Sequence, residues 1–455
     1  MFSKLTSIRA LAVAVAIPTS VGLCASQDAT TRTIQSLQSH LKVFPGDFKA
    51  YDALGAAYIQ RGRETADASY YELAKEALTK SLDLVSSDPA AASAKTHMAV
   101  VSMSEHEFED ALGWAQDALA LGSGDPSPWA IAGDALTDMG EYEQAAEAYE
   151  KLSNPFGPRG GRSSGLAYEH DSRVAYLRFV QGDSENAIRL MHQALATAEA
   201  LHMPAENVAW SDYQLGEICF KSGDLGCAER AYQAGLSIDP NSYRNFAGLG
   251  ELRAAQERYL EAVALYQKAI AVVPYPMFAA ALYDLDVKLG YVEDARKQYD
   301  LIEFMGKLNP VNQRLFYREL ALFYADHDLK LEESVGLAKS ELRVRRDIYS
   351  WDILAWVLHK NGRELEACEA MKHALALGTK DPVLEFHAGM IEERLGHVER
   401  ARALLERALA SNPHFHVLYA DQARRTLAQI STGEPRTAFC RPWARPPKTG
   451  GMLQR

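Results

Sequence analysis

The chain has 455 residues, of which 47% are hydrophobic, and its 60 acidic and 48 basic side chains give a formal net charge of −12. This composition excludes a disordered acidic chain and a bundle of membrane helices, and it predicts a soluble protein with a large core. The acidic balance argues against nucleic acid as a partner, because phosphate binding needs clustered Lys and Arg.

Residues 1–25 have the pattern of an export signal. Two basic residues precede an apolar run from Ala10 to Leu23, and small residues then lead into a polar stretch. We predict cleavage near Ala25, with an uncleaved membrane anchor as the alternative. The run is short and interrupted for a bilayer span. We therefore expect an exported protein, periplasmic or extracellular, with no transmembrane span in the mature chain.

The first structural element is a helix predicted within residues 31–47. Ile34, Leu37 and Leu41 recur at helical spacing before Pro45. The pattern is typical of the second helix of a truncated repeat. We expect this helix to cap the N-terminal end of the array that follows.

Repeated units then occupy residues 48–156 and 168–413. A small residue marks the same position of each unit, and the basic period is 34 residues, as between Ala111 and Ala145. A glycine precedes several of these positions by twelve residues, and an aromatic residue follows several of them by four. The full set is Ala74, Ala111, Ala145, Ala187, Ala228, Ala262, Ala295, Ser334, Ala367 and Ala401. Helical periodicity between Leu260 and Ile270 predicts a pair of antiparallel helices per unit, stabilised by stacking on its neighbours.

A Gly- and Arg-rich insertion, residues 157–167, separates the third unit from the fourth. Arg159 and Arg162 could hold an anion, but no strand precedes them and no phosphate-binding helix follows. We interpret the segment as a flexible linker. Such a break predicts that the array has two arms.

Two further segments complete the chain. Residues 414–430 are amphipathic, with Leu418, Leu427 and Ile430 on one face, and are predicted to cap the last unit. Residues 431–455 are rich in Pro, Arg and Gly, which predicts a disordered basic tail.

The spacing of glycine, alanine, aromatic residues and proline resembles the tetratricopeptide repeat, most fully over residues 242–274. Residues 319–328 and 349–356 are similar to stretches in bacterial tetratricopeptide-repeat proteins, exported or cytoplasmic. The resemblance implies an all-α, right-handed superhelical solenoid of about ten helical hairpins with terminal capping helices, and a habit of binding proteins. It brings no catalytic residues. Ser334 and Glu341 depart from the pattern in the eighth repeat, where small apolar residues are usual.

Metal and cofactor chemistry has little support in the sequence. Asp326, His327 and Asp328 are consecutive residues at a helix end, so their side chains point in different directions, whereas a metal site needs converging ligands. His414 and His416 are interpreted as turn residues at a repeat boundary. We assign no metal and no cofactor.

Catalysis is also not expected. The sequence lacks a His-Glu-x-x-His pair, a Gly-x-Ser-x-Gly elbow and a Cys-x-x-Cys motif. Repeats and caps occupy residues 31–430 and leave no room for a catalytic domain. The alternative from another class is an unrecognised enzyme built on a helical solenoid.

Cys219 and Cys227 flank the predicted turn of one hairpin, and two interpretations remain open. Export makes a disulfide between them possible. Equally, both fit a repeat that prefers small core residues. A bridge requires Cα atoms within about 7 Å of each other.

The predicted binding surface is the concave groove formed by the first helices of successive repeats. The groove residues expected there are Tyr176, Phe179, Trp210, Tyr213, Glu217, Phe220 and Glu251, with Asp134, Asp138 and Asp284 nearby. Aromatic anchors beside carboxylates suit an extended or helical segment that carries apolar and basic side chains. The competing interpretation is that these aromatics only pack between repeats.

The sequence therefore predicts a non-catalytic protein-protein interaction scaffold that binds partner protein segments in its groove. The alternative is a structural subunit of an envelope assembly or export complex. The oligomeric state is not predicted.

Overall fold

The structure is a computed structural model, and it describes residues 25–85, 89–153, 164–307 and 315–430. Within these ranges the chain is helical and contains no strand. The predicted signal, apart from Ala25, and the predicted tail at 431–455 lie outside the described residues. Residues 157–163 of the predicted insertion also lie outside the described residues, and residues 164–167 form the first turn of α8.

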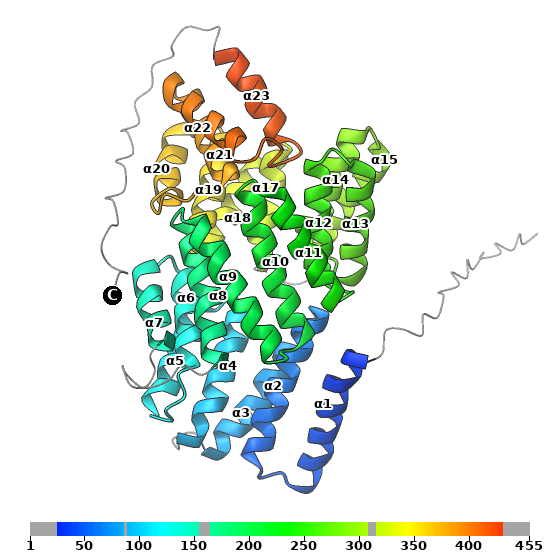
Figure 1. The fold of residues 1–455 in the computed structure, drawn as a ribbon, viewed down its shortest axis with the longest axis vertical. Coiled ribbons are helices and arrows are strands. Elements are labelled where there is room, and N and C mark those ends of the chain that lie inside the picture. The colour runs from blue at the N-terminus through cyan, green and yellow to red at the C-terminus, as the bar shows by residue number, and fades with distance from the viewer. Residues whose placement is uncertain (1–24, 86–88, 154–163, 308–314, 431–455) are drawn as a thin grey trace, which may run out of the picture.

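The described helices form ten antiparallel hairpins, called repeats 1 to 10, that stack in chain order into a right-handed superhelix (Figure 1). The hairpins are α2 (Phe48–Thr65) with α3 (Ser69–Val85), α4 (Ala92–Ser104) with α5 (Phe108–Ala120), α6 (Pro128–Asp138) with α7 (Tyr142–Ser153), α8 (Ser164–Val180) with α9 (Ser184–Ala200), α10 (Ala205–Lys221) with α11 (Leu225–Ile238), α12 (Tyr243–Ala255) with α13 (Tyr259–Val272), α14 (Pro276–Leu289) with α15 (Val292–Met305), α17 (Tyr317–Asp326) with α18 (Leu331–Val344), α19 (Ile348–Lys360) with α20 (Glu364–Ala374), and α21 (Pro382–Arg394) with α22 (Val398–Ser411).

One further helix lies at each end of the stack. Helix α1 (Ala25–Val43) packs against α2, and Gln38 donates a hydrogen bond to the hydroxyl of Tyr58 over 2.8 Å. Helix α23 (Tyr419–Ile430) packs against α21 and α22. No helix in the described part of the chain is both long and apolar enough to cross a membrane.

Close approach of the two helices in a hairpin depends on the glycines of the repeat. Gly216 of α10 lies against the ring of Tyr232 on α11, and a Cβ atom added there would overlap that ring. Tyr232 is completely buried. Gly133 stands in the same relation to Tyr149 in repeat 3. The ring of the second helix thus occupies the space that the glycine leaves open.

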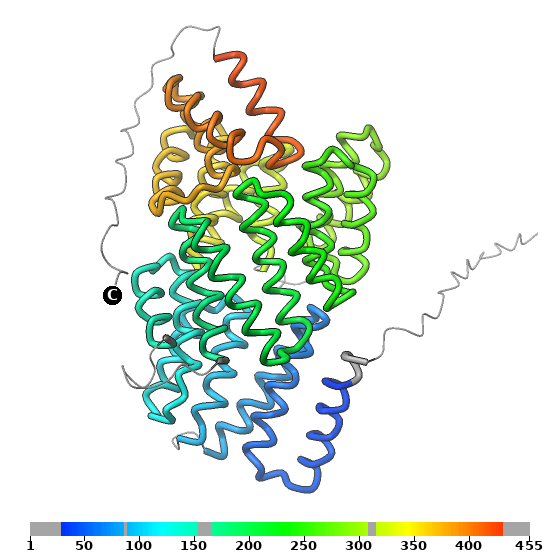
Figure 2. Tube along the Cα trace, viewed as in Figure 1, coloured from blue at the N-terminus to red at the C-terminus, as the bar shows by residue number. Residues whose placement is uncertain are grey.

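The stack is continuous, so the expectation of two arms is wrong. Helix α7 packs against α8 across the insertion, as the second helix of one repeat packs against the first helix of the next elsewhere in the stack. Figure 2 shows the trace of these repeats side by side. Stacking buries the apolar faces of both hairpins, so the change in composition at the insertion does not interrupt the stack.

Repeat 8 accommodates the two residues that depart from the usual pattern. Ser334 is completely buried, and Glu341 is 2% exposed. The carboxylate of Glu341 lies 3.3 Å from Nη1 of Arg345 and 3.8 Å from Nε of Arg318. The buried charge is therefore paired with two guanidinium groups, as burial of a carboxylate requires.

The superhelix closes on itself along a line of contacts that we call the seam. The tips of repeats 3, 4 and 5 meet the loops that follow repeats 8, 9 and 10, respectively. The backbone amide of Arg346 donates to the carbonyl of Asp138 over 2.9 Å. The hydroxyl of Thr379 donates to the carbonyl of Val180, and the side-chain amide of Asn412 donates to that of Phe220 over 3.2 Å.

Glycine makes this approach possible. Gly140, Gly182 and Gly223 sit at the three tips with φ of +80°, +78° and +82°. A Cβ on any of them would overlap a carbonyl oxygen across the seam. Each tip therefore needs glycine both for its left-handed backbone and for the space.

Candidate functional site

The concave faces of the first helices line a partly open cavity of about 350 Å³, called the interior cavity. Its walls come from α10, α12, α14, α17, α19 and α21, with the loop between α22 and α23 as a further wall. Aromatic and aliphatic residues such as Tyr266, Phe278 and Leu322 form much of the lining. Six repeats thus contribute to one cavity.

Three of the predicted groove residues line the interior cavity: Tyr213 and Glu217 on α10, and Glu251 on α12. Each is half-buried. They lie on one face of two adjacent first helices, and the structure brings them together.

The other four predicted groove residues lie elsewhere. Phe179 and Phe220 are 3% and 2% exposed, and the structure places them in the core rather than on the groove. Their core cluster also contains Ile348 and Leu384 from the other side of the seam. Tyr176 and Trp210 are half-buried and are not among the residues that line the cavity.

Glu217 and Glu251 form an acidic pair in the cavity wall. The hydroxyl of Tyr232 donates to Oε1 of Glu217 over 2.7 Å. Burial, and then the charge of Glu217, raises the pKa of Glu251 to about 8. Burial also raises the pKa of Glu217. The two carboxyl groups therefore share a site that disfavours negative charge on both at once.

The charge of Lys221 acts on both carboxyl groups of this pair, but its ammonium group binds another carboxylate. Its Nζ lies 2.8 Å from Oδ2 of Asp381, whose side chain is 1% exposed. Against the effect of burial, Lys221 holds the pKa of Asp381 below its usual value. The hydroxyl of Tyr349 donates to the same oxygen over 3.1 Å.

The consecutive residues Asp326, His327 and Asp328 point to three different partners. Asp326 accepts hydrogen bonds from the indole of Trp356, over 2.7 Å, and from the hydroxyl of Tyr419, over 2.6 Å. The other two residues pair with Asp284 of α14 over 2.9 Å and with Lys360 over 2.8 Å, respectively. Across the residues that the structure describes, no three His, Cys, Asp or Glu side chains are grouped so that they could hold a metal.

The interpretation of His414 and His416 as turn residues missed their position in the cavity. Both line it, with Phe415 between them, from the loop that precedes α23. Burial lowers the pKa of His416 to about 4, so its ring is neutral at pH 7. The ring stacks on that of Tyr419 with centroids 4.0 Å apart. No local sequence pattern predicts that this loop forms a wall of the cavity, because the contacts of the seam place the loop beside it.

Cys219 and Cys227 are joined by a disulfide in the structure, with Cα atoms 5.7 Å apart. This separation lies within the ordinary range for a disulfide. The bridge links the end of α10 to the start of α11 and spans the tip of repeat 5. The same tip carries Lys221 and the carbonyl of Phe220, so the covalent link lies beside the seam.

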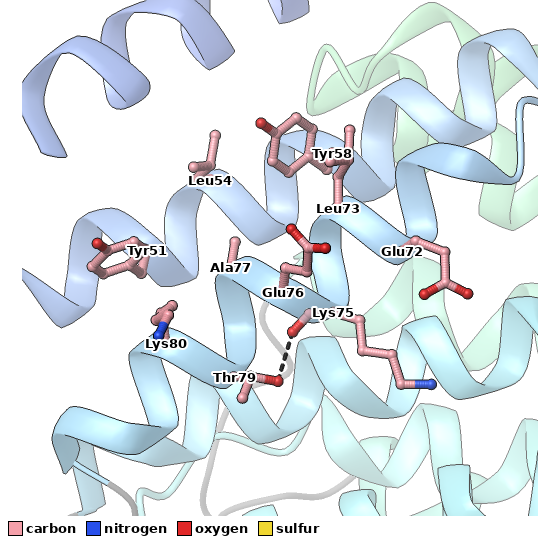
Figure 3. Close-up of a pocket in the computed structure, with 10 residues that line it drawn as sticks. All are labelled: Tyr51, Leu54, Tyr58, Glu72, Leu73, Lys75, Glu76, Ala77, Thr79 and Lys80. Carbon is pink, nitrogen blue, oxygen red and sulfur yellow. Dashed lines mark hydrogen bonds between the residues drawn. The ribbon is translucent and has the colours of Figure 1, made fainter. Parts of the chain in front are cut away.

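A second, shallower hollow lies on repeat 1 between α2 and α3, and Figure 3 shows the side chains around it. Tyr51, Leu54 and Ala77 give it an apolar floor, and charged residues of α3 surround them. The hydroxyl of Thr79 donates to the carbonyl of Lys75 over 2.7 Å, which is a contact within α3. The hollow belongs to a single repeat and gathers no converging polar groups.

Comparison with known proteins identifies one repeat directly. Residues 127–153, which span the hairpin of α6 and α7, match the family model of the tetratricopeptide repeat. No curated protein matches the chain.

Several solved structures match this chain at low sequence identity. Yeast Tom70 is 14% identical with a TM-score of 0.36, over 89% of this chain and 93% of that one. A tetratricopeptide repeat protein from Parabacteroides merdae is 17% identical with a TM-score of 0.32, over 59% of this chain and 100% of that one. PilW, a type IV pilus biogenesis factor, is 16% identical with a TM-score of 0.38, over 50% of this chain and 98% of that one.

Proposed function

Because the chain is a solenoid of tetratricopeptide-type hairpins, we propose that it is a non-catalytic scaffold that holds a segment of a partner protein in the interior cavity. The observation that carries the proposal is the lining of this cavity. The first helices of repeats 5 to 10 converge on it, and they bring aromatic and carboxylate side chains together. Solenoids of this kind use their concave faces for binding.

We further propose that the protein works outside the cytoplasm. Two features support export: the signal-like pattern of residues 1–25 and the disulfide between Cys219 and Cys227. Mass spectrometry of the chain recovered from a fractionated host tests this proposal. We expect an N-terminus near residue 26 in the exported fraction, and an intact N-terminus in the cytoplasm would contradict it.

Site-specific photocrosslinking tests the binding proposal. Met277 lines the cavity and is 47% exposed, so a photoreactive amino acid at this position reaches both the cavity and its surroundings. Val292, 74% exposed and absent from the cavity lining, is the matched control. We expect a crosslinked partner at position 277 that disappears when Ala281→Phe fills the cavity. Equal crosslinking at both positions, unaffected by Ala281→Phe, would contradict the proposal.

The same crosslinks separate a scaffold from a structural subunit. Several partners in amounts below that of the chain favour the scaffold. One dominant stoichiometric partner would indicate a subunit of a fixed assembly.

A further inference from the structure

Three carboxylates of the seam and the first helices have guanidinium partners, one of which, Arg318, also lines the interior cavity. Asp134 lies 2.8 Å from Nε of Arg173, and Asp138 lies 2.9 Å from Nε of Arg345. Asp347 lies 2.7 Å from Nη2 of Arg318. These three carboxylates are thus each paired with a guanidinium group, which offsets the cost of burying their charge.

Glu251 differs from these three carboxylates. Among the described residues, none donates a hydrogen bond to its carboxylate, and none forms a salt bridge with it. The charge of a second carboxylate, Glu217, acts on it, and Glu217 accepts a hydrogen bond from the neutral hydroxyl of Tyr232. Lys221 stands close enough to act on both, but its ammonium group is bound to Asp381.

A second, independent acceptor in the same cavity also lacks a donor. The Oε2 atom of Glu319, on α17, has almost no contact with solvent and no hydrogen-bond partner. The hydroxyl of Tyr275 reaches only its other oxygen, over 3.4 Å. A buried carboxylate oxygen without a donor costs free energy that a ligand donor would recover.

The remaining walls are suited to a hydrocarbon stem. Tyr213 and Tyr266 stand near Glu251, and Phe278, Leu322 and Phe323 continue the lining. An occupant that is both cationic and partly aliphatic would satisfy the carboxylates and cover these apolar surfaces.

We propose that the interior cavity binds an organic cation, an ammonium or guanidinium group on an aliphatic stem, with Glu251 and Glu217 as its anionic partners. A Lys or Arg side chain of a partner protein and a free polyamine share this chemistry. The inference deepens the proposed function, because it names the group that enters the cavity.

Cation binding is expected to release a proton. The pKa of Glu251 stands at about 8 in the free protein, so this carboxyl group is mostly protonated at pH 7. A bound cation favours the ionised form and expels the proton, and affinity should therefore rise from pH 6 to pH 9. The titratable and charged groups that line the cavity with Glu251 or act on it are Tyr213, Glu217 and Lys221 on α10, Tyr232 on α11, Tyr266 on α13, Asp284 on α14, Arg318, Glu319 and Asp326 on α17, His327 after α17, Asp381 before α21, His414 and His416 before α23, and Tyr419 on α23. Of these, the two cations Lys221 and Arg318 are bound to Asp381 and Asp347, respectively.

Calorimetric titration of the full chain tests the inference with defined probes. The cations are 1,5-diaminopentane and N-acetyl-lysine methylamide, and the uncharged control is N-acetyl-norleucine methylamide. We expect saturable binding of at least one cation, no binding of the control, and proton release at pH 7 in buffers that differ in ionisation enthalpy. Preference for the lysine derivative indicates a protein side chain, and preference for the diamine indicates a free polyamine.

Two variants locate the site. Glu251→Gln removes the charge at constant shape and should weaken cation binding by about tenfold or more. Glu261→Gln, at an exposed position paired with Arg258, is the matched control and should leave binding unchanged. Equal binding of cation and uncharged control, an unaffected Glu251→Gln variant, or no cation binding at millimolar concentration would each overturn the inference.

Failure of this inference and failure of the proposed function are distinguishable. In one outcome, a partner crosslinks at position 277, the crosslink is lost with Ala281→Phe, and it is retained with Glu251→Gln. This outcome would support the scaffold and contradict the cation site. Cation binding in the calorimeter without any crosslinked partner would support the cation site and contradict the scaffold.

Discussion

The ammonium group of Lys221 lies 2.8 Å from the carboxylate of Asp381, although 160 positions separate the two residues in the sequence. Asp381 also accepts a hydrogen bond from the backbone amide of Val383 over 2.9 Å, at the start of α21. The pair therefore links the tip of repeat 5 to the first turn of repeat 10. It joins the interior cavity to the seam, because Lys221 belongs to both.

Removing the cation from this pair should destabilise the fold. Lys221→Met leaves the almost fully buried carboxylate of Asp381 without its charged partner, and we expect a loss of about 3 kcal/mol in the free energy of unfolding. Urea denaturation followed by circular dichroism measures it. Lys297→Met removes an exposed ion pair with Asp294 and should leave stability unchanged. Equal midpoints for both variants would show that the pair contributes little to the seam.

A buried carboxyl group on α10 makes stability depend on pH. Asp212 is 5% exposed, its Oδ2 has no hydrogen-bond partner, and burial, with Glu199 adding to it, raises its pKa to about 7. Between pH 3.8, the pKa of this carboxyl group in the unfolded chain, and about pH 7, the folded chain binds a proton at Asp212 that the unfolded chain has lost. The contribution of Asp212 to the free energy of unfolding therefore falls as the pH rises through that window.

Asp212→Asn should remove this loss. We expect the free energy of unfolding of the variant to exceed that of the parent by on the order of 2 kcal/mol at pH 8, and this difference to shrink towards pH 4. Thermal or urea unfolding at both pH values checks this, with the exposed Asp300→Asn as control. A constant difference between pH 4 and pH 8 would contradict titration of Asp212.

The disulfide at the tip of repeat 5 should contribute to stability chiefly through the unfolded chain. Cys219 and Cys227 close a short loop, with a sequence separation of 8. Loop-closure entropy predicts a loss of about 2 to 3 kcal/mol for the double variant with serine at both positions. A thiol count on the denatured, unreduced protein tests the bridge itself. Reaction of both cysteines with the thiol reagent before reduction would rule it out.

Two glycines in helix interiors should respond to alanine with opposite signs. Gly216→Ala forces a methyl group into the ring of Tyr232 and should cost about 1 to 3 kcal/mol. Gly113, in α5, has nothing within 4 Å of an added Cβ, so Gly113→Ala should stabilise by up to about 1 kcal/mol through helix propensity. Melting temperatures that shift in the same direction would contradict the packing described for repeat 5.

The hairpins could be predicted from the sequence because their determinants are local. Gly216 and Tyr232 lie in the two helices of one unit, and the same spacing recurs along the chain. Each glycine and its ring meet within one hairpin, so a periodic pattern is enough to place them. The pair Tyr213 and Glu217 follows from helical spacing in the same way.

The seam could not be predicted, because it depends on the pitch accumulated over five repeats. Arg346 reaches Asp138, and Asn412 reaches Phe220 across 192 positions, with no periodic signal linking either pair. The misplacement of Phe179 and Phe220 has the same origin. Both lie in the last turn of a first helix, where an open superhelix would expose them to the groove and the seam covers them.

The seam also sets how many repeats the chain can have. An open solenoid gains or loses a unit without disturbing the others, because each repeat touches only its neighbours. Here the loops after repeats 8, 9 and 10 meet the tips of repeats 3, 4 and 5, always at the same offset. Duplication or deletion of one unit between repeats 5 and 8 would bring every tip to the wrong loop. Gain or loss of a whole repeat in this stretch would therefore break the seam, whereas repeats 1 and 2 lie outside it.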